Sequence, residues 1–378
     1  DDYYAKLQKL KLAYPCFCTE DQLALNRKIQ RSAGQAPRYP GTCRHLSESE
    51  VRAKEEKGLK PTLRFHVPNG KTIQFQDLVR GQQTFMSDDI GDFIIRRADG
   101  TASFLYCNAI DDALMGVTHA LRGEDHLTNT PRQLLIVEAL NLQPPQYGHI
   151  SLILGSDGSP LSKRNGSRSI KELREEGYLP LAVNNYLARL GHHYASDEFL
   201  PLEKLSEYFN ADSLVKSAAR FDVDQLNRWQ KQAVMSLDNA AMKRWLADID
   251  LEFVPREHTE RFLEVARPNI LFPKEAKRWA VAIFAPHIEY SHEGKTILKK
   301  AGINFFEKAL EALNESGTDY KALVNHLKVK SELSGAALFH PLRVALTGET
   351  FGPELLHVLP LMGQALAKQR LESALYAV

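Results

Sequence analysis

The spacing of apolar residues changes near residue 170, and this change constrains the fold more than any other feature of the sequence. Before that point, short apolar and β-branched stretches alternate with turns and helix-like segments. After it, apolar residues recur almost everywhere at helical spacing, as in the face formed by Leu179, Ala182 and Tyr186. Because 378 residues exceed what one hydrophobic core usually serves, we expect a mixed first half and an all-α second half.

The first 103 residues predict a small α+β unit. Helical patterns end near Leu12 and run again from Asp21 to Arg31. Alternating apolar residues from Thr62 to Phe85 predict a β-hairpin that turns at Pro68-Asn69-Gly70, and Phe93–Arg97 predicts a further strand.

The next segment predicts an α/β layer with parallel strands. The apolar stretches Phe104–Ile110, Val117–Leu121 and Tyr147–Leu154 each predict a strand. A helix from Thr130 to Leu142 separates the last two, with proline in its first turn. The layer is too short for a complete nucleotide-binding sheet.

Three of the four cysteines lie in the first 45 residues and predict a structural zinc site. Cys16 and Cys18 form one pair of ligands, and Cys43 with His45 forms a second pair across a helical segment. Three thiolates and one imidazole complete a tetrahedral zinc shell with no open position. The alternative is that these are buried free cysteines and an exposed histidine. Cys107 lies in an apolar stretch and is expected to be a plain core thiol.

A Ser162-Lys163-Arg164 run lies in a loop rich in glycine and serine. Two cations on such a backbone suit a triphosphate whose charge moves during reaction, although a lone basic loop is more often a solvated turn.

The composition excludes several classes of protein. The formal net charge is +1, from 48 basic and 47 acidic residues, which argues against nonspecific coating of nucleic acid. No run of eighteen apolar residues occurs, so we expect no membrane span. The few, clustered cysteines are typical of a reducing compartment, and we expect the cytoplasm.

An ordered series of motifs resembles the bacterial-type glutamyl-tRNA synthetases, which are class I aminoacyl-tRNA ligases. The similarity extends over essentially the whole chain. The motifs are Tyr14-Pro15-Cys16-Phe17-Cys18, Pro37-Arg38-Tyr39, Cys43-Arg44-His45, Phe93-Ile94-Ile95-Arg96-Arg97, Asp111-Asp112, Arg122-Gly123-Glu124-Asp125-His126, Asn129-Thr130-Pro131-Arg132-Gln133, Leu161-Ser162-Lys163-Arg164, Gly177-Tyr178-Leu179-Pro180 and Pro341-Leu342-Arg343-Val344-Ala345-Leu346-Thr347-Gly348.

The resemblance implies a fold class and four domains. The fold would be α/β, a partial Rossmann-like catalytic domain with an α+β insertion, followed by an all-α anticodon-binding region. Residues 1–103 would form the acceptor-stem-binding insertion with the zinc knuckle, and 104–169 the second half of the catalytic domain. Residues 170–235 would contact the tRNA stem, and 236–378 would bind the anticodon.

The resemblance also implies roles for individual residues. Lys163 would neutralise the ATP phosphates while glutamate attacks the α-phosphate, and Arg164 would assist. Leu161, Ser162 and Asp125 would also lie at the ATP. Arg122 would hold a carboxylate of the glutamate, and Asn108 and Phe104 would face the same pocket. Mg²⁺ would accompany the phosphates, tRNA(Glu) would be the second substrate, and the protein would be a monomer.

The sequence departs from the family pattern in ways that keep alternatives open. Its first residues, Asp1-Asp2-Tyr3-Tyr4, resemble the middle of a helix, and no His-x-Gly-His signature occurs in the expected context, so we expect about 95 upstream residues to be missing. Phe104 stands where the family usually has tyrosine, Pro160 replaces a lysine, and Asn165 stands where histidine is frequent. The alternatives are a paralogous ligase with altered amino-acid or tRNA choice, and a non-catalytic tRNA-binding module.

Overall fold

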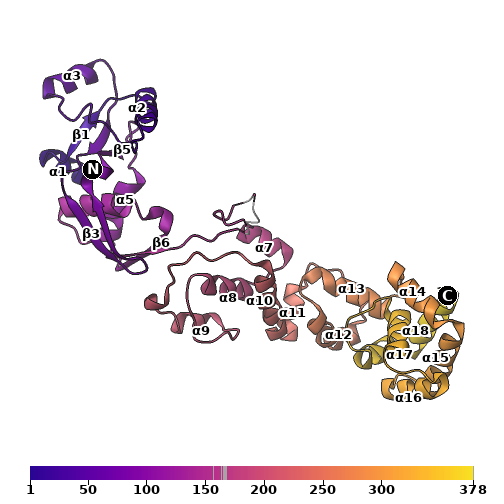
Figure 1. Cartoon of the computed structure of the whole chain (residues 1–378). Coiled ribbons are helices and arrows are strands. Elements are labelled where there is room, and N and C mark those ends of the chain that lie inside the picture. The colour runs from indigo at the N-terminus through magenta and orange to yellow at the C-terminus, as the bar shows by residue number, and fades with distance from the viewer. Residues whose placement is uncertain (156, 163, 165–167, 378) are drawn as a thin grey trace. The chain divides into compact units, whose positions relative to one another are not determined.

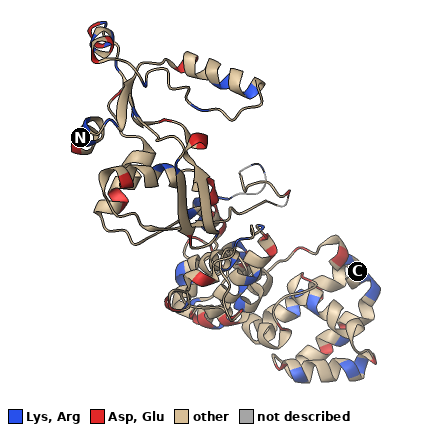
Figure 2. Ribbon diagram, turned by 60° about the vertical axis from the view of Figure 1, so that its left-hand side comes forward, with Lys and Arg blue, Asp and Glu red and all other residues tan. Residues whose placement is uncertain are grey.

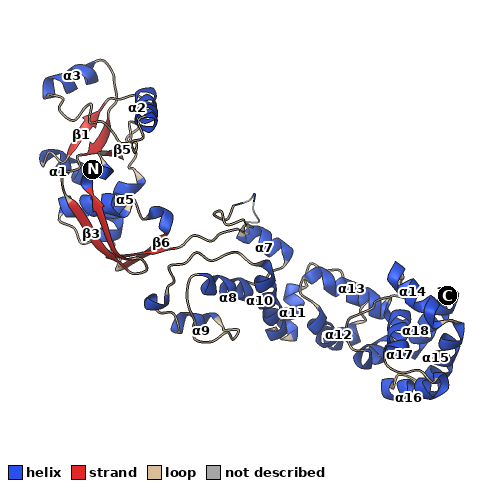
Figure 3. Ribbon diagram, in the orientation of Figure 1, coloured by secondary structure: helices blue, strands red, loops and turns tan. Residues whose placement is uncertain are grey.

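The computed structural model describes residues 1–155, 157–162, 164 and 168–377 (Figure 1). The chain divides into two compact units. The first comprises Asp1–Gly166, Arg189–Ser196 and Glu207–Phe221, and the second comprises Ser167–Ala188, Asp197–Ser206 and Asp222–Val378. Helices and strands are mixed in the first unit, and the second unit is helical, as the sequence predicts (Figure 3).

Three small sheets lie in the first unit. An antiparallel sheet has the strand order β1-β2-β5, an antiparallel hairpin joins β3 to β4, and β6 pairs with β7 in parallel. The strands are β1 (Ala13–Cys16), β2 (Thr62–Phe65), β3 (Thr72–Asp77), β4 (Gly81–Met86), β5 (Phe93–Arg96), β6 (His119–Gly123) and β7 (Gln146–Ile150).

The helices of the first unit begin at side-chain caps in several cases. Thr19 and Ser47 each form a capping box, and Ser103 accepts a hydrogen bond from the Tyr106 amide. These helices are α1 (Asp2–Lys9), α2 (Glu20–Ser32), α3 (Glu48–Glu56), α4 (Ser87–Ile90), α5 (Phe104–Leu114) and α6 (Thr130–Leu140), with the short 3₁₀ helices η1 (Glu124–His126) and η3 (Ala211–Ser213).

The remaining helices belong mainly to the second unit. They are α7 (Ile170–Glu176), α8 (Pro180–Leu190), α9 (Leu202–Glu207), α10 (Val223–Ser236), α11 (Asn239–Trp245), η4 (Arg256–His258), α12 (Thr259–Ala266), η5 (Arg267–Asn269), α13 (Pro273–Phe284), α14 (His292–Ala301), α15 (Ile303–Ser316), α16 (Tyr320–Ser331), α17 (Ala336–Thr347) and α18 (Leu355–Ala377).

Each unit has its own apolar core. In the first, Leu7 of α1, Ile95 of β5 and Ile136 of α6 are completely buried in one cluster. In the second, a larger cluster includes Phe306 of α15 and Leu342 of α17. Basic and acidic residues are interspersed along the helices, consistent with the near-neutral net charge (Figure 2).

Two sequence predictions about the first unit are wrong. The segment Phe104–Ile110 is the start of α5 rather than a strand, so Cys107 is helical. Its buried members Tyr106, Ala109 and Ile110 follow helical spacing, which a short apolar run does not distinguish from a strand.

The predicted hairpin across Pro68-Asn69-Gly70 is also wrong. The strands on either side of that turn belong to different sheets, because β2 pairs with β1 and β5 while β3 pairs with β4. The actual hairpin turns between β3 and β4, where Asp77 Oδ1 accepts hydrogen bonds from the amides of Val79 (2.9 Å) and Arg80 (2.7 Å). Alternation identifies strands but does not choose their partners.

In the part of the chain that the structure describes, no helix is both long enough and apolar enough to cross a membrane.

Candidate functional site

The parallel strands β6 and β7 bring Arg122 and His149 side by side. Their Cα atoms are register partners near the carboxyl ends of the strands. In open α/β sheets ligands bind outside these carboxyl ends. Helix α6 connects the two strands, and its first residue, Thr130, is completely buried against both side chains.

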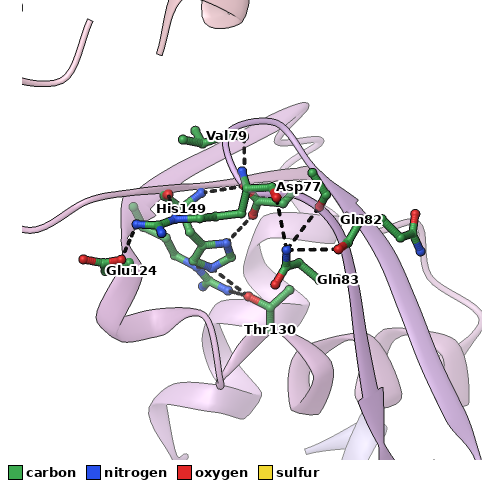
Figure 4. A network of polar contacts seen from close by, with 10 residues as sticks. Asp77, Val79, Gln82, Gln83, Glu124, Thr130 and His149 are labelled. Atoms are coloured by element: carbon green, nitrogen blue, oxygen red, sulfur yellow. Dashed lines mark hydrogen bonds and ion pairs between the residues drawn. The ribbon is translucent and has the colours of Figure 1, made fainter. Parts of the chain in front are cut away.

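A continuous network of hydrogen bonds joins these residues to the β3–β4 hairpin (Figure 4). Arg122 Nε donates to His149 Nε2 at 3.2 Å, and Arg122 Nη2 donates to Thr130 Oγ1 at 2.5 Å. Thr130 Oγ1 lies 2.9 Å from His149 Nε2. On the other side of the ring, Nδ1 lies 2.5 Å from Asp77 Oδ2. The network therefore runs from the hairpin through His149 to the guanidinium of Arg122.

Helix α5 supplies a second contact to the same guanidinium. Arg122 Nη1 donates to Asn108 Oδ1 at 3.5 Å, and Gln133 Nε2 donates to the same oxygen at 2.6 Å. The ring of Tyr147 lies 4.9 Å from the Arg122 guanidinium carbon. Gln133 Oε1 and the Tyr147 hydroxyl are buried and have no hydrogen-bond partner among the described residues. The guanidinium is thus held by neutral groups and an aromatic face.

Arg122 forms no ion pair with any acidic side chain among the described residues. Burial lowers its pKa, but a guanidinium remains protonated in proteins. The charges of Asp112 and Asp77 act on Arg122 and oppose this lowering, but neither forms an ion pair with it among the described residues. A half-buried cation without a direct counterion is costly unless a ligand supplies one. The arrangement is therefore suited to an anionic ligand.

The Asp77–His149 pair is completely buried. Burial raises the pKa of Asp77, but hydrogen bonds from His149 and from backbone amides outweigh it, so the pKa lies below its usual value. Burial also lowers the pKa of His149, although the bond to Asp77 opposes this. The pair is therefore an ionised carboxylate with a neutral imidazole at neutral pH.

Arg80 and Glu124 close the other side of the hairpin. They form an ion pair, and Arg80 also donates to the Ser151 hydroxyl (2.8 Å) and the His149 carbonyl (3.3 Å). Glu124 accepts from the Leu152 amide at 3.2 Å. These bonds fix the hairpin to the segments that follow β6 and β7.

The predicted ATP residues lie on two segments. Asp125 lies in η1, and its carboxylate is largely exposed. This carboxylate lies so close to Gly123 that a side chain at position 123 would clash with it. Leu161 donates its amide to Ile153 at 2.8 Å, which closes the base of the predicted loop, and Ser162 and Arg164 are exposed. Lys163 lies outside the described residues.

Phe104 is the first residue of α5 and is 48% exposed. Its ring centroid lies 5.5 Å from that of His126. The side chain is therefore available to a ligand but offers no hydroxyl.

Three of the four predicted zinc ligands come together. The Sγ atoms of Cys16, Cys18 and Cys43 lie within 4.8 Å of one another, and those of Cys18 and Cys43 are 3.7 Å apart. Sulfur atoms bound at about 2.3 Å in a tetrahedron are about 3.8 Å apart, so the spacing fits zinc. His45 is exposed and lies outside this group.

The Tyr39 hydroxyl lies beside the three cysteines. It is 3.3 Å from Cys16 Sγ, 3.5 Å from Cys18 Sγ and accepts from the Cys43 amide at 2.9 Å. Burial raises the pKa of the Cys16 thiol, but hydrogen bonds from Tyr39 and Arg64 lower it to about 7 overall. Burial raises the pKa of Cys18 to about 11. The cluster already favours one thiolate.

Sequence reasoning overlooked Asp77, His149 and the polar side chains of α6. Thr130 and Gln133 lie in one of the motifs that resemble the family, but the resemblance assigned them no role, and His149 lies in none of those motifs. The available signal was a histidine inside an apolar stretch, where a buried ring needs a polar partner. The identity of that partner depends on strand pairing that the sequence did not reveal.

Comparison with known proteins agrees with this architecture. Residues 1–228 match the family model described as tRNA synthetases class I (E and Q), catalytic domain, and residues 215–375 match the model of an anticodon binding domain. A glutamate–tRNA ligase 2 of Coxiella burnetii is 53% identical over 374 residues, which are 99% of this chain and 80% of that protein. One of Nitrosococcus oceani is also 53% identical, over 98% of this chain and 79% of that protein.

Solved structures show the same fold. The crystal structure of a glutamate tRNA ligase from Elizabethkingia meningosepticum, in complex with its amino acid, aligns with a TM-score of 0.84 at 24% identity, over 99% of this chain and 82% of that one. The glutamate–tRNA synthetase of Elizabethkingia anophelis aligns with a TM-score of 0.86 at 24% identity, over 100% of this chain and 82% of that one.

The two family models show that the chain is a class I tRNA synthetase of the E and Q group with an anticodon-binding region, and the parallel pair β6–β7 and the helical second unit agree with this. Within that group, the chain belongs to the glutamate–tRNA ligase family.

Proposed function

We propose that this chain attaches L-glutamate to tRNA(Glu) with ATP, through a glutamyl-adenylate, and that Arg122 binds a carboxylate of the glutamate. Membership of the glutamate–tRNA ligase family supports the reaction. The observation that carries the assignment of Arg122 is its half-buried charge, which is held by Asn108, Thr130 and His149 without an acidic partner among the described residues. A planar guanidinium binds carboxylates in a bidentate manner.

Two further side chains complete this glutamate site. Asn108 receives hydrogen bonds on Oδ1 from Arg122 and Gln133, so its amide group has a fixed orientation. Phe104 contributes an exposed ring at the start of α5.

ATP binds, in this proposal, beside the carboxyl edge of the sheet. Asp125, Leu161 and Ser162 contact the nucleotide, and the cations Lys163 and Arg164 neutralise its phosphates while the glutamate carboxylate attacks the α-phosphate. Mg²⁺ enters with ATP as part of the substrate. The enzyme's contribution is positioning and charge stabilisation, because ATP already carries the leaving group.

The proposal is tested by aminoacylation kinetics of the intact ligase with tRNA(Glu). Arg122→Gln is expected to raise KM for glutamate far more than KM for ATP. Arg97→Gln is a matched control, since Arg97 is an exposed arginine of the same unit whose side chain donates to the Thr101 hydroxyl and the Ala102 carbonyl. Equal effects of the two variants would contradict the assignment.

A structural zinc ion is a second part of the proposal. Cys16, Cys18 and Cys43 would hold it, with the Tyr39 oxygen in place of His45 as the fourth donor, and the ion would fasten the loop that follows α2 to β1. Metal analysis is expected to give about one zinc per chain. Cys16→Ser and Tyr39→Phe should weaken zinc binding and His45→Ala should not. If His45→Ala weakened zinc binding and Tyr39→Phe did not, the fourth ligand would be His45, as the sequence predicts.

Phe104 favours one variant of the proposed function, a paralogous ligase with altered amino-acid or tRNA choice. A missing hydroxyl at this place changes the hydrogen bonds available to the substrate, an effect of about 1 to 3 kcal/mol. Phe104→Tyr is expected to lower KM for glutamate if the chain binds glutamate and lacks only the hydrogen bond of the tyrosine hydroxyl. An unchanged KM would indicate a different substrate preference.

The remaining assignments concern location and assembly. We place the tRNA acceptor stem on residues 1–103, the inner stem on 170–235 and the anticodon on 236–378, in a cytoplasmic monomer. Footprinting of tRNA(Glu) with variants in each range, together with light scattering of the intact ligase, would test these assignments.

A further inference from the structure

His149 is a fully buried titratable group that the proposed reaction does not use. Its side chain is 0% exposed, as is that of Asp77. Both ring nitrogens are engaged, Nδ1 with Asp77 Oδ2 at 2.5 Å and Nε2 with Arg122 Nε at 3.2 Å and Thr130 Oγ1 at 2.9 Å. The ring therefore connects the β3–β4 hairpin to the arginine of the glutamate site (Figure 4).

We infer that Asp77 and His149 are positioning residues that hold Arg122 ready for glutamate by fixing His149 as the neutral tautomer protonated on Nδ1. This inference rests on the proposed role of Arg122.

The tautomer follows from the hydrogen bonds on each side of the ring. Arg122 is only a donor, so the nitrogen that faces it must be an acceptor. The Thr130 hydroxyl accepts from Arg122 Nη2 and therefore directs its own proton to the same nitrogen. Nε2 carries no proton in this arrangement, and the ring proton lies on Nδ1, where the Asp77 carboxylate accepts it.

A second proton on His149 would break this arrangement. It would place an Nε2–H against the Nε–H of Arg122 and against the Thr130 hydroxyl, and it would put two cations side by side. Arg122 would then lose the contact that orients its Nε edge. The groups that face His149 and set its charge are Asp77 of β3, Arg122 of β6, His126 of η1, Tyr147 of β7 and Arg80 of the hairpin turn.

Asp77 is locked in one orientation by its other oxygen. Oδ1 accepts three backbone amides, from Val79 (2.9 Å), Arg80 (2.7 Å) and His149 (3.2 Å). In Asp77→Asn these three donors would keep the amide oxygen at the Oδ1 position, so the NH₂ group would face His149 Nδ1. The ring would then have to accept on Nδ1 and carry its proton on Nε2, against Arg122. An isosteric change on the hairpin thus inverts the tautomer.

The hairpin gains a second function through this link. Asp77 closes the β3–β4 turn with the same oxygen that holds the His149 amide, and Arg80 with Glu124 ties that turn to the ends of β6 and β7. Only a correctly seated hairpin presents Oδ2 to the ring. The glutamate site is therefore preorganised by a segment of the preceding α+β region, not by the parallel sheet alone.

The test combines kinetics with spectroscopy of the intact ligase. In Asp77→Asn, KM for glutamate is expected to rise about tenfold or more, while KM for ATP changes little. Asp99→Asn is the matched control, because Asp99 is an exposed carboxylate of the same unit that caps the turn after β5. Ring ¹⁵N shifts of the histidine-labelled protein, assigned by their loss in His149→Gln, are expected to change from the Nδ1–H to the Nε2–H pattern.

Each outcome separates this inference from the proposed function. A wild-type ring protonated on Nε2, or an inverted tautomer with unchanged KM for glutamate, would overturn the inference. If Arg122→Gln also left that KM unchanged, the proposed glutamate site would fail as well. A purely structural role would lower the melting temperature of Asp77→Asn without a specific effect on glutamate. In the wild type, KM for glutamate is expected to rise in acid as His149 takes its second proton, and Asp77→Asn should lose that dependence.

Discussion

Each of the two units contains an arginine that forms no ion pair with a carboxylate among the described residues, half-buried in the first unit and buried in the second, and the two are satisfied differently. Arg370 of α18 is 1% exposed and donates to the carbonyl oxygens of Leu346 (3.4 Å), Val281 (3.5 Å) and Ala285. These carbonyls lie at the carboxyl ends of α17 and α13, where the helix dipole is negative. Burial lowers the pKa of Arg370 to about 10, and the charge has no access to a ligand.

Arg122 has a different environment. Its donors meet a ring nitrogen, a hydroxyl and an amide oxygen, and none of these carries a negative charge. The helical unit supplies backbone carbonyl oxygens to both terminal nitrogens of Arg370, although its Nε has no hydrogen-bond partner among the described residues. The first unit offers Arg122 only neutral side-chain groups. A structural arginine and a binding arginine therefore differ in the source of the compensating charge, and the binding arginine is also the less buried of the two.

The largest expected effect comes from exchanging Arg122. Arg122→Gln should lower kcat/KM for glutamate by at least about 100-fold, or about 3 kcal/mol, because a charge-assisted pair with the substrate is lost. The melting temperature should stay the same or rise, since an uncompensated charge is removed. Steady-state kinetics and calorimetry would measure the two quantities. A large fall in stability would place Arg122 in the same class as Arg370.

Arg370→Met should have the reverse effect. It leaves buried carbonyl oxygens of two helix ends unpaired, and we expect the free energy of unfolding to fall by about 2 kcal/mol. KM for glutamate should not change. Denaturant titration and steady-state kinetics of both variants would show whether Arg370 affects mainly the free energy of unfolding and Arg122 mainly the KM for glutamate. A shift in KM for Arg370→Met would contradict the comparison.

Arg44 offers a third case, an arginine paired with a carboxylate, and the smallest expected effect. It contacts Asp92 through Nε (2.9 Å) and Nη2 (2.5 Å), and Tyr14 donates to the same carboxylate at 2.5 Å. Burial raises the pKa of Asp92, but the bonds from Arg44 and Tyr14 hold it below its usual value. A depressed carboxyl pKa contributes stability that is present above the unfolded value, near pH 4, and is lost as the pH falls through the folded value.

We therefore expect acidification below about pH 4 to remove about 1 kcal/mol of stability that depends on Asp92. Asp92→Asn should be less stable at neutral pH and should lack this part of the acid dependence. Urea unfolding between pH 3 and 7, observed with a local probe in the first unit, would measure this pH-dependent free energy of unfolding. An identical pH profile in wild type and variant would show that the ion pair contributes nothing.

The sequence predicted the helical unit more completely than the first. Ala182 and Tyr186 lie on α8 as their spacing indicated, and Leu179 directly precedes this helix, because helical periodicity is local. In the first unit, the strand pairing depended on contacts between distant segments, such as Leu63 of β2 with Pro15 of β1. Alternation within a strand carries no information about such partners, and the predicted hairpin failed for that reason.

The sequence predicted the residues proposed to contact glutamate, but not the residues that hold Arg122 in place. Arg122 and Asn108 were recognised by motif, and the structure brings them together. Asp77 and His149 were not, since their relation spans 72 positions and arises only when the hairpin packs on β7. The cysteine cluster was predicted, whereas the contacts of the Tyr39 hydroxyl with it were not, because a tyrosine in a loop has no ligand signature.

The most direct test of glutamate binding by Arg122 is a crystal structure of the intact ligase with L-glutamate bound. The account predicts a glutamate carboxylate within about 3 Å of the terminal nitrogens of Arg122, with His149 and Thr130 still bonded to the guanidinium. Glutamate bound with both carboxylates away from Arg122, or an Arg122 that leaves His149 to pair with a protein carboxylate, would contradict it.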